Sequence, residues 1–317
     1  MSVIKPISGS FLEIEHPNRA ERVRTHEPLC AFTETMWRAK VRELHELGID
    51  TLILLSTALR GQAYFPLEGF PCPDHIACQN VIDVLLDEAD KTGQSMYVGV
   101  GFYGDSDSVN NSTDPAIVAT AMTAIETLWG LYGHHPSFVG WYIADEWCLW
   151  EHFDERFITY INTVSAKAKA LSPTTKVIVA PFGTHCMHID DVLVGQLSRI
   201  DADAIAYQDE IGVKKMSLDR LAERYEALSR AHKKAGRAKL WVDTEIFTFE
   251  GDVYRSALLP ASFERIKAQL EAVSPFVEKV IAYTCQGMMS KPDSLTPLGG
   301  EQAERLYGEY KTWVEQL

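Results

Sequence analysis

The sequence predicts an α/β fold, a (β/α)8 TIM barrel, and three observations indicate it. Short runs rich in Val, Ile and aromatic residues alternate with longer segments of helical period, and each kind occurs eight times. This alternation predicts a parallel sheet, because a parallel connection needs a crossover and the crossover here is a helix. The Gly-rich phosphate turn of doubly wound open sheets is absent after the first run. We therefore expect one closed barrel as a single domain over residues 1–317.

The eight predicted strands are apolar for most of their length, which is typical of strands buried on both faces. They are PISGSFLEI (6–14), IDTLILLST (49–57), SMYVGVGFYGD (95–105), FVGWYIADEW (138–147), KVIVAPFG (176–183), DAIAYQDE (203–210), KLWVDTEIF (239–247) and KVIAYTCQG (279–287). A polar-apolar segment of helical period follows each one. The predicted helices span 35–48, 74–93, 114–133, 152–173, 188–200, 217–236, 262–279 and 299–317.

Composition and charge narrow the class of protein. With 46% hydrophobic residues, 20 Gly and 14 Pro, the chain is long enough for one large core and too well mixed for disorder. Its net charge of -14 leaves no basic surface for nucleic acid, and an anionic membrane would repel it. No run of eighteen apolar residues occurs, and MSVIKPISGSFLEI lacks a long apolar segment. We expect a cytoplasmic protein whose partner is a small molecule; the oligomeric state cannot be inferred.

The pattern of cysteines and histidines predicts no metal and no cofactor. The six cysteines contain no CxxC pair, so we expect reduced thiols and no zinc site built on them. They are Cys30, Cys72, Cys78, Cys148, Cys186 and Cys285. His185 and His188 are spaced three apart, which makes a metal site conceivable on a helix, but such a pair alone has little specificity.

The fourth strand ends in two adjacent acids, Asp145 and Glu146. Function in this fold lies at the carboxyl ends of the strands and in the loops that follow them. Alternation with period two places Tyr142 and Glu146 toward the barrel axis and Val139 toward the helices. By the same count Asp145 leans toward the helix layer, although a twisted strand end can bring both acids to the mouth.

The seventh strand ends in a matching acid, Glu245, with Asp243 deeper on the same face. We expect Asp243 to neutralise a buried arginine such as Arg60. Glu146 and Glu245 then face each other across one pocket. Glycoside hydrolysis needs such a pair, because one carboxyl protonates the leaving oxygen and the other attacks the anomeric carbon or activates water.

At these residues the sequence resembles clan A, the large clan of retaining (β/α)8 glycoside hydrolases, which has one glutamate ending strand four and another ending strand seven. The segments PISGSFLEI, GWYIADEW and AIAYQDEIG also look like an uncharacterised family of glycosidase-like barrels. The resemblance implies that Glu146 is the acid/base and Glu245 the nucleophile. In the clan an Asn that binds the sugar 2-hydroxyl usually precedes the acid/base; this chain has Asp145 there.

Other strand ends offer groups that could bind a sugar. Neutral polyols need directional donors and acceptors, and the apolar faces of sugar rings stack on aromatic side chains. Glu13, at the end of the first strand, is expected in the pocket or at its rim. The further candidate substrate-binding residues are Tyr103, Asp145, Trp147, Tyr207, Gln208 and Gln286.

These residues predict a glycosidase for a small oligosaccharide or glycoside, and two alternatives stay open. A divalent-metal-dependent sugar isomerase or epimerase could use Glu146, His185, Asp209 and Glu245 as ligands. A barrel that binds carbohydrate without catalysis is the other alternative, because a fold alone does not confer activity.

Overall fold

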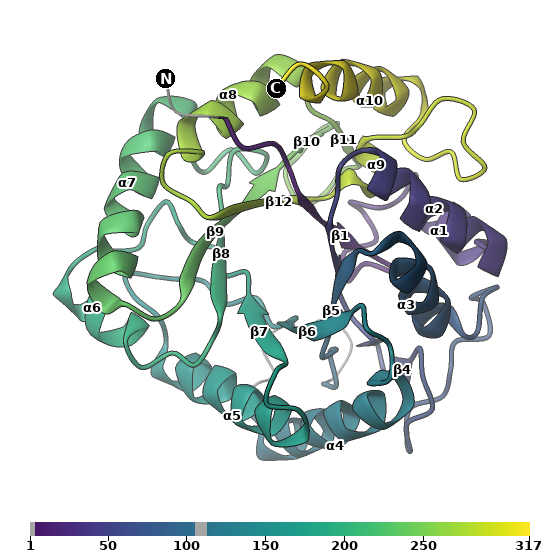
Figure 1. Ribbon diagram of the computed structural model, residues 1–317, viewed down its shortest axis with the longest axis horizontal. Coiled ribbons are helices and arrows are strands. Elements are labelled where there is room, and N and C mark those ends of the chain that lie inside the picture. Colours follow the sequence, from purple (N-terminus) through teal and green to yellow (C-terminus); the bar gives the residue numbers. More distant parts are fainter. Residues whose placement is uncertain (1–3, 105–112) are drawn as a thin grey trace.

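A computed structural model describes residues 4–104 and 113–317, and its strands close into a parallel barrel (Figure 1). Around the barrel the order is β1-β12-β9-β8-β7-β6-β5-β2. The bounds are β1 Gly9–Leu12, β2 Thr51–Leu54, β5 Ser95–Gly99, β6 Phe138–Ile143, β7 Lys176–Val179, β8 Ala204–Gln208, β9 Lys239–Glu245 and β12 Lys279–Tyr283. The predicted barrel is confirmed, and each strand falls within a predicted run. Asp105, which ends the third run, lies outside the described residues.

Helices surround the barrel, as Figure 1 shows looking along its axis. Those that follow the barrel strands are α2 Glu34–Glu46, α3 Val81–Thr92, α4 Pro115–Tyr132, α5 Glu155–Leu171, α6 Asp191–Leu197, α7 Leu218–Ala235, α8 Phe263–Val273 and α10 Gly300–Val314. Shorter elements lie in the loops: α1 His26–Cys30, α9 Cys285–Met288, the hairpin of β3 Ala58–Leu59 and β4 Gln62–Ala63, and the hairpin of β10 Phe247–Phe249 and β11 Leu258–Pro260. The sequence did not predict these shorter elements.

The observed helices are shorter than the predicted ones, and for two of them the local reason is clear. The helix expected over 74–93 begins only at Val81, because Gln79 donates its side-chain amide to the carbonyl of Pro73 and holds the preceding segment in a loop. The helix expected over 262–279 ends at Val273, close before Pro275. A proline lacks the N–H that would continue the helix and restricts the residue before it.

The apolar residues form an inner and an outer layer. Phe11, Tyr142 and Trp241 belong to the cluster inside the barrel, whereas Trp141 belongs to the larger cluster between sheet and helices. The expectation that Val139 faces the helices was wrong, because it packs against the inner cluster. Between β5 and β6 the register advances from Phe138 to Gly140, so Val139 is the extra residue of a β-bulge, and a bulge interrupts the alternation of faces.

None of the helices within residues 4–104 and 113–317 is both long and apolar enough to cross a membrane. The cytoplasmic location stays a prediction.

A close backbone approach in the sheet gives a first test of the fold. A Cβ added to Gly99 would lie 2.5 Å from Leu54 O and closer still to Leu55 O, so backbone would have to shift. We expect Gly99→Ala to lower the free energy of unfolding by about 1–3 kcal/mol in urea denaturation. Gly130→Ala is the control, because that exposed site in α4 has open space and alanine there should add about 0.5–1 kcal/mol. Equal stability of the two variants would contradict the packing described.

Candidate active site

A cavity of about 1140 Å3 opens at the carboxyl ends of the barrel strands. Several of its lining residues come from strand ends or from the residues just after them. Glu146 follows β6, Gln208 ends β8, Glu245 ends β9 and Tyr283 ends β12. Because the strands are parallel, these ends meet at one mouth. The structure therefore brings Glu146, Glu245 and Gln208 together as the sequence predicts.

The surroundings of Glu146 raise the pKa of its carboxyl group. Its carboxyl is hydrogen-bonded to the side chain of Gln208, and the Tyr142 hydroxyl lies 3.5 Å from its Oε1. Burial raises the pKa of Glu146 to about 7, with further contributions from the negative charges of Glu21 and Glu13. A carboxyl with such a pKa can give a proton at neutral pH and take one back.

Glu245 is almost fully buried and is fixed by backbone. The N–H of Val213 donates to Glu245 Oε2 over 2.8 Å. Burial and the nearby charge of Asp209 raise the pKa of Glu245, while the Val213 N–H and the positive charge of Arg265 act in the opposite direction. The net result is a pKa of Glu245 well above its usual value, and these two groups limit that rise and so favour the carboxylate, which is the form that can act as a nucleophile.

Asp243 lines the same cavity and does not neutralise Arg60, so that expectation was wrong. Arg60 instead donates to the backbone carbonyls of His16 and Pro17. Burial, together with the charges of Glu146 and Glu245, raises the pKa of Asp243. The three acids therefore oppose one another's ionisation, so the cluster carries fewer charges than it has carboxyls.

Glu13 lies one layer behind the cavity, and Tyr283 covers it. The Glu13 carboxylate is 2.7 Å from Arg22 Nη2 and accepts from the Tyr283 hydroxyl, and both charged residues are buried. Arg22 also lies over the Tyr283 ring, 5.3 Å from its centroid. Sequence reasoning missed Tyr283, although alternation from the inward Ile281 could have found it.

Two other predicted substrate-binding residues do not line the cavity. The Gln286 amide bonds to both backbone groups of Glu13, at 2.8 Å and 3.1 Å, and so ties the end of β12 to β1. The Tyr207 hydroxyl lies 3.1 Å from His232 Nε2 on α7, in the outer layer. Successive side chains on a strand point to opposite faces of the sheet, so Tyr207, the neighbour of the inward Gln208, faces the helices. Both side chains therefore make hydrogen bonds within the fold and do not take the pocket positions expected.

The remaining three predicted residues face the helix layer. Asp145 is buried against the Tyr160 hydroxyl, and burial raises the pKa of Asp145 to about 7. Trp147 stacks on Phe157 of α5 with ring centroids 5.5 Å apart. Tyr103 donates its hydroxyl to the Val100 carbonyl. None of the three lines the cavity: period two turns Asp145 outward, Trp147 packs on a helix, and the Tyr103 ring packs against Phe70 of the loop after β4.

The cavity wall also carries cations and aromatic rings that the sequence did not reveal. Lys215 lies over the rings of Phe182 and Tyr254, at 5.4 Å and 5.3 Å from their centroids. Arg60 has a left-handed backbone, with φ of 53°, and its buried Nη1 has no hydrogen-bond partner among the described residues. A donor held in this way is available to a ligand hydroxyl or carboxylate.

Of the four ligands expected for the isomerase alternative, Glu146 and Glu245 line the cavity, whereas His185 and Asp209 do not. His185 bonds through Nδ1 to Glu210 at 2.9 Å, and His188 packs on His152. Asp209 is fully buried and accepts from Gln269 at 2.6 Å. Within the described parts of the chain, three other groups of His, Cys and acidic side chains lie close enough to share an ion, and none of them lines the cavity.

Comparison of sequences identifies the family. Residues 7–296 match the family described as a domain of unknown function, DUF4434. The chain belongs to this family. No curated protein matches it in sequence.

Solved structures share the fold of this DUF4434 chain. A protein from Bacteroides thetaiotaomicron, provisionally named an alpha-L-fucosidase, has a TM-score of 0.78 at 21% identity, covering 99% of this chain and 97% of its own. An endo-beta-1,4-mannanase from Thermotoga petrophila has a TM-score of 0.62 at 12% identity, covering 98% and 77%. An endo-1,4-beta-mannanase from Rhizomucor miehei has a TM-score of 0.60 at 10% identity, covering 99% and 96%. These likenesses show that the chain shares the barrel fold of these proteins over nearly its whole length.

The raised pKa of Asp145 makes stability depend on pH. The folded state keeps a proton on Asp145 that the unfolded chain releases near pH 4, so this contribution to the free energy of unfolding falls as the pH rises from about 4 to about 7. We expect Asp145→Asn, which cannot ionise, to be more stable than the wild type by about 2–4 kcal/mol at pH 8 and about equal at pH 4. Urea denaturation at both pH values measures the difference. A variant less stable than the wild type at pH 8 would contradict it.

Proposed function

We propose that this protein is a glycoside hydrolase that acts on a small oligosaccharide or glycoside by retaining double displacement. The observation that carries the proposal is the placement of Glu146 and Glu245 on one cavity, at the ends of β6 and β9. Two carboxyls flanking one cavity are what glycoside hydrolysis requires. Their surroundings also differ, which supports different roles for the two acids.

In the first step Glu146 is the general acid and Glu245 the nucleophile. Glu146 transfers its proton to the glycosidic oxygen while a Glu245 oxygen attacks the anomeric carbon and the bond to the leaving group breaks. The leaving group departs as a neutral alcohol, and the sugar stays attached to Glu245 as an ester. The Val213 N–H and Arg265 help Glu245 to be ionised at the start.

In the second step Glu146 reverses its role. As a carboxylate it takes a proton from a water molecule, whose oxygen attacks the anomeric carbon and displaces Glu245. Glu245 loses its negative charge when it forms the ester in the first step. The group of acids around Asp243 then carries less negative charge, so Glu146 can more easily stay ionised until the water attacks. The product keeps the anomeric configuration of the substrate.

The wall of the cavity suits a carbohydrate. Its volume of about 1140 Å3 exceeds what a single sugar needs, and Phe247, Tyr254 and Phe182 offer aromatic surface for sugar faces. Arg60 and Lys215 can donate to hydroxyl or carboxylate groups. The similar structures named as mannanases and provisionally as a fucosidase make glycosides the first compounds to test.

Substitution of the two glutamates should separate their roles. We expect Glu245→Gln to abolish turnover of every glycoside, because an amide cannot form the covalent intermediate. Glu146→Gln should still release an activated aryl leaving group but should be slow in the second step. Added azide needs no base, so it should restore turnover of Glu146→Gln and give a glycosyl azide of retained configuration, which NMR can identify.

The matched control is Glu250→Gln, which removes an exposed acid from the same side of the barrel and should keep wild-type activity. Inversion of configuration, or full activity of Glu146→Gln on an unactivated glycoside, would contradict the assigned roles. Absence of hydrolysis by the wild type across a panel of aryl glycosides would favour a barrel that binds carbohydrate without catalysis.

The pH dependence should follow the proton on Glu146. Because its pKa is about 7 and the first step needs the protonated form, kcat/KM should fall as the pH rises through about 7. In Glu146→Gln, assayed on an activated aryl glycoside, this alkaline limb should disappear. Initial rates between pH 5 and 9 measure both profiles, and an alkaline limb unchanged in Glu146→Gln would assign it to another group.

A further inference from the structure

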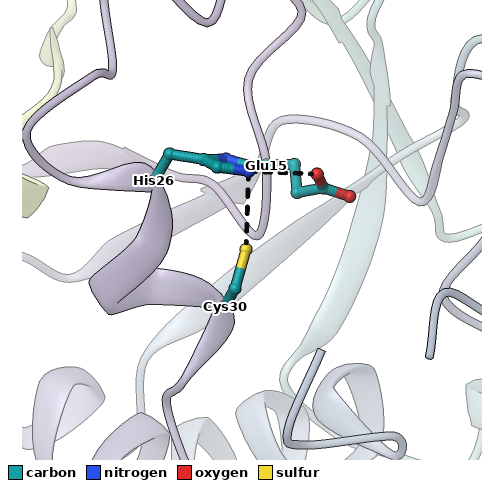
Figure 2. Close-up of side chains that lie close together, drawn as sticks. All are labelled: Glu15, His26 and Cys30. Carbon is teal, nitrogen blue, oxygen red and sulfur yellow. Dashed lines mark hydrogen bonds and ion pairs between the residues drawn. The ribbon is translucent and has the colours of Figure 1, made fainter. Parts of the chain in front are cut away.

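A mixed group of donor atoms lies beside the cavity, in the loop after β1 and on α1. Figure 2 shows Glu15, His26 and Cys30 with their side chains directed at one another. His26 Nε2 is 3.7 Å from Cys30 Sγ and 3.8 Å from Glu15 Oε1, and all three donor atoms lie within 4.8 Å of one another. The helix α1 explains part of this, because residues four apart share one face.

These separations are close to those of ligands around one zinc ion. Bonds of about 2.0–2.3 Å at tetrahedral angles place neighbouring ligand atoms about 3.3–3.6 Å apart. The two distances measured from His26 Nε2, 3.7 Å and 3.8 Å, exceed this range by only a few tenths of an ångström. Small side-chain rotations are therefore enough to form three metal bonds.

A fourth donor stands next to the group. His75 Nε2 is 3.1 Å from Glu15 Oε1, and its side chain is 43% exposed, so it has room to turn toward the others. The loop that carries it is attached to α1, because Ala77 N donates to Cys30 O at 2.8 Å. The other carboxylate oxygen, Glu15 Oε2, accepts from the Tyr64 hydroxyl at 2.9 Å. That bond orients Glu15 in the way that outer hydrogen bonds orient metal ligands.

We propose that Glu15, His26, Cys30 and His75 form a binding site for Zn2+. One thiolate, two imidazoles and one carboxylate match the donors that zinc prefers, and a thiolate disfavours Mg2+ and Ca2+. The thiolate and the carboxylate together balance the two charges of the ion. Binding releases the Cys30 proton to solvent.

Neither of the other two groups in the described residues is an equal candidate, since each lacks a thiolate. In one, His135 is already held by Asp90 at 2.6 Å. In the other, Asp190 caps the start of α6 and two of the three side chains are exposed. The group at Glu15 is the one that combines a soft donor, burial and a supporting hydrogen bond.

The position of the site gives the ion a structural role. The segment 16–21 lines the cavity and lies between the ligands Glu15 and His26 in the chain. Zinc would therefore fix both ends of a rim loop. It would also replace the weak pairing of Glu15 with Arg19, a cavity residue whose side chain is 60% exposed and 3.8 Å from Glu15 Oε1.

Metal binding to the full-length chain tests the proposal without any substrate, so its result is separate from that of the glycosidase assays. Protein stripped with EDTA should take up one Zn2+ at this site in competition with a chromophoric chelator, and its Tm should rise with added zinc. Co2+ in place of zinc should give a thiolate-to-metal charge-transfer band. We expect Cys30→Ser to lose this band and most of the zinc affinity.

Cys78→Ser is the matched control, because it removes another buried thiol nearby and should keep both signals. Two milder variants guard against misfolding of Cys30→Ser. Tyr64→Phe removes only the hydrogen bond to Glu15 and should weaken zinc binding by about 10–100-fold. His75→Gln, at an exposed position, should weaken it as well. Zinc affinity equal in wild type, Cys30→Ser and Tyr64→Phe, or a Co2+ spectrum without the thiolate band, would overturn the proposal.

Discussion

The mutual repulsion of carboxyl groups buried at the ends of β6, β8 and β9 is the constraint on which the site depends. Glu146, Asp209, Asp243 and Glu245 all have raised pKa values, because burial disfavours their ionised forms, and neighbouring negative charge adds to this at Glu146, Asp243 and Glu245. A structure that only needed stability would replace such acids with apolar residues. Keeping them requires specific donors around the cluster, and these donors differ between Glu146, beside Gln208 and Tyr142, and Glu245, beside the Val213 N–H and Arg265.

The donors to these acids come from helices and loops packed around the barrel. Gln269 on α8 donates to Asp209, and Arg265 on the same helix donates to the carbonyl of Glu245, so one helix supports two of the acids from behind. On the opposite wall Arg22 neutralises Glu13 and holds Tyr283 against the cavity. The barrel strands thus place the acids, and the helices and loops carry the hydrogen-bond donors and positive charges that stabilise these acids in a buried site.

The segment after β1 joins the two functions proposed for this protein. Glu13 lies behind Tyr283 at the cavity, and two residues later Glu15 turns to the group that contains His26 and Cys30. The intervening rim residues line the cavity. A metal bound at Glu15 would act on catalysis only through the position of this loop, because no ligand of that site touches the cavity. The proposed zinc site and the proposed catalytic site are therefore neighbours, and neither takes part in the chemistry of the other.

The sequence by itself determined the barrel and the two catalytic candidates, because strand composition, helical period and the alternation of faces are local properties. Alternation was enough to direct Glu146 and Glu245 to the mouth and Tyr142 inward, whereas Gln208 was expected there only because it lies at a strand end. It failed at Val139, since the bulge depends on pairing with β5. It also left open which loop aromatics reach the cavity, and Trp147 does not. The metal group was decided only by the tertiary structure: its donors lie in the loop after β1, on α1 and in the loop before α3, and no spacing along the chain signals that folding brings them within bonding reach.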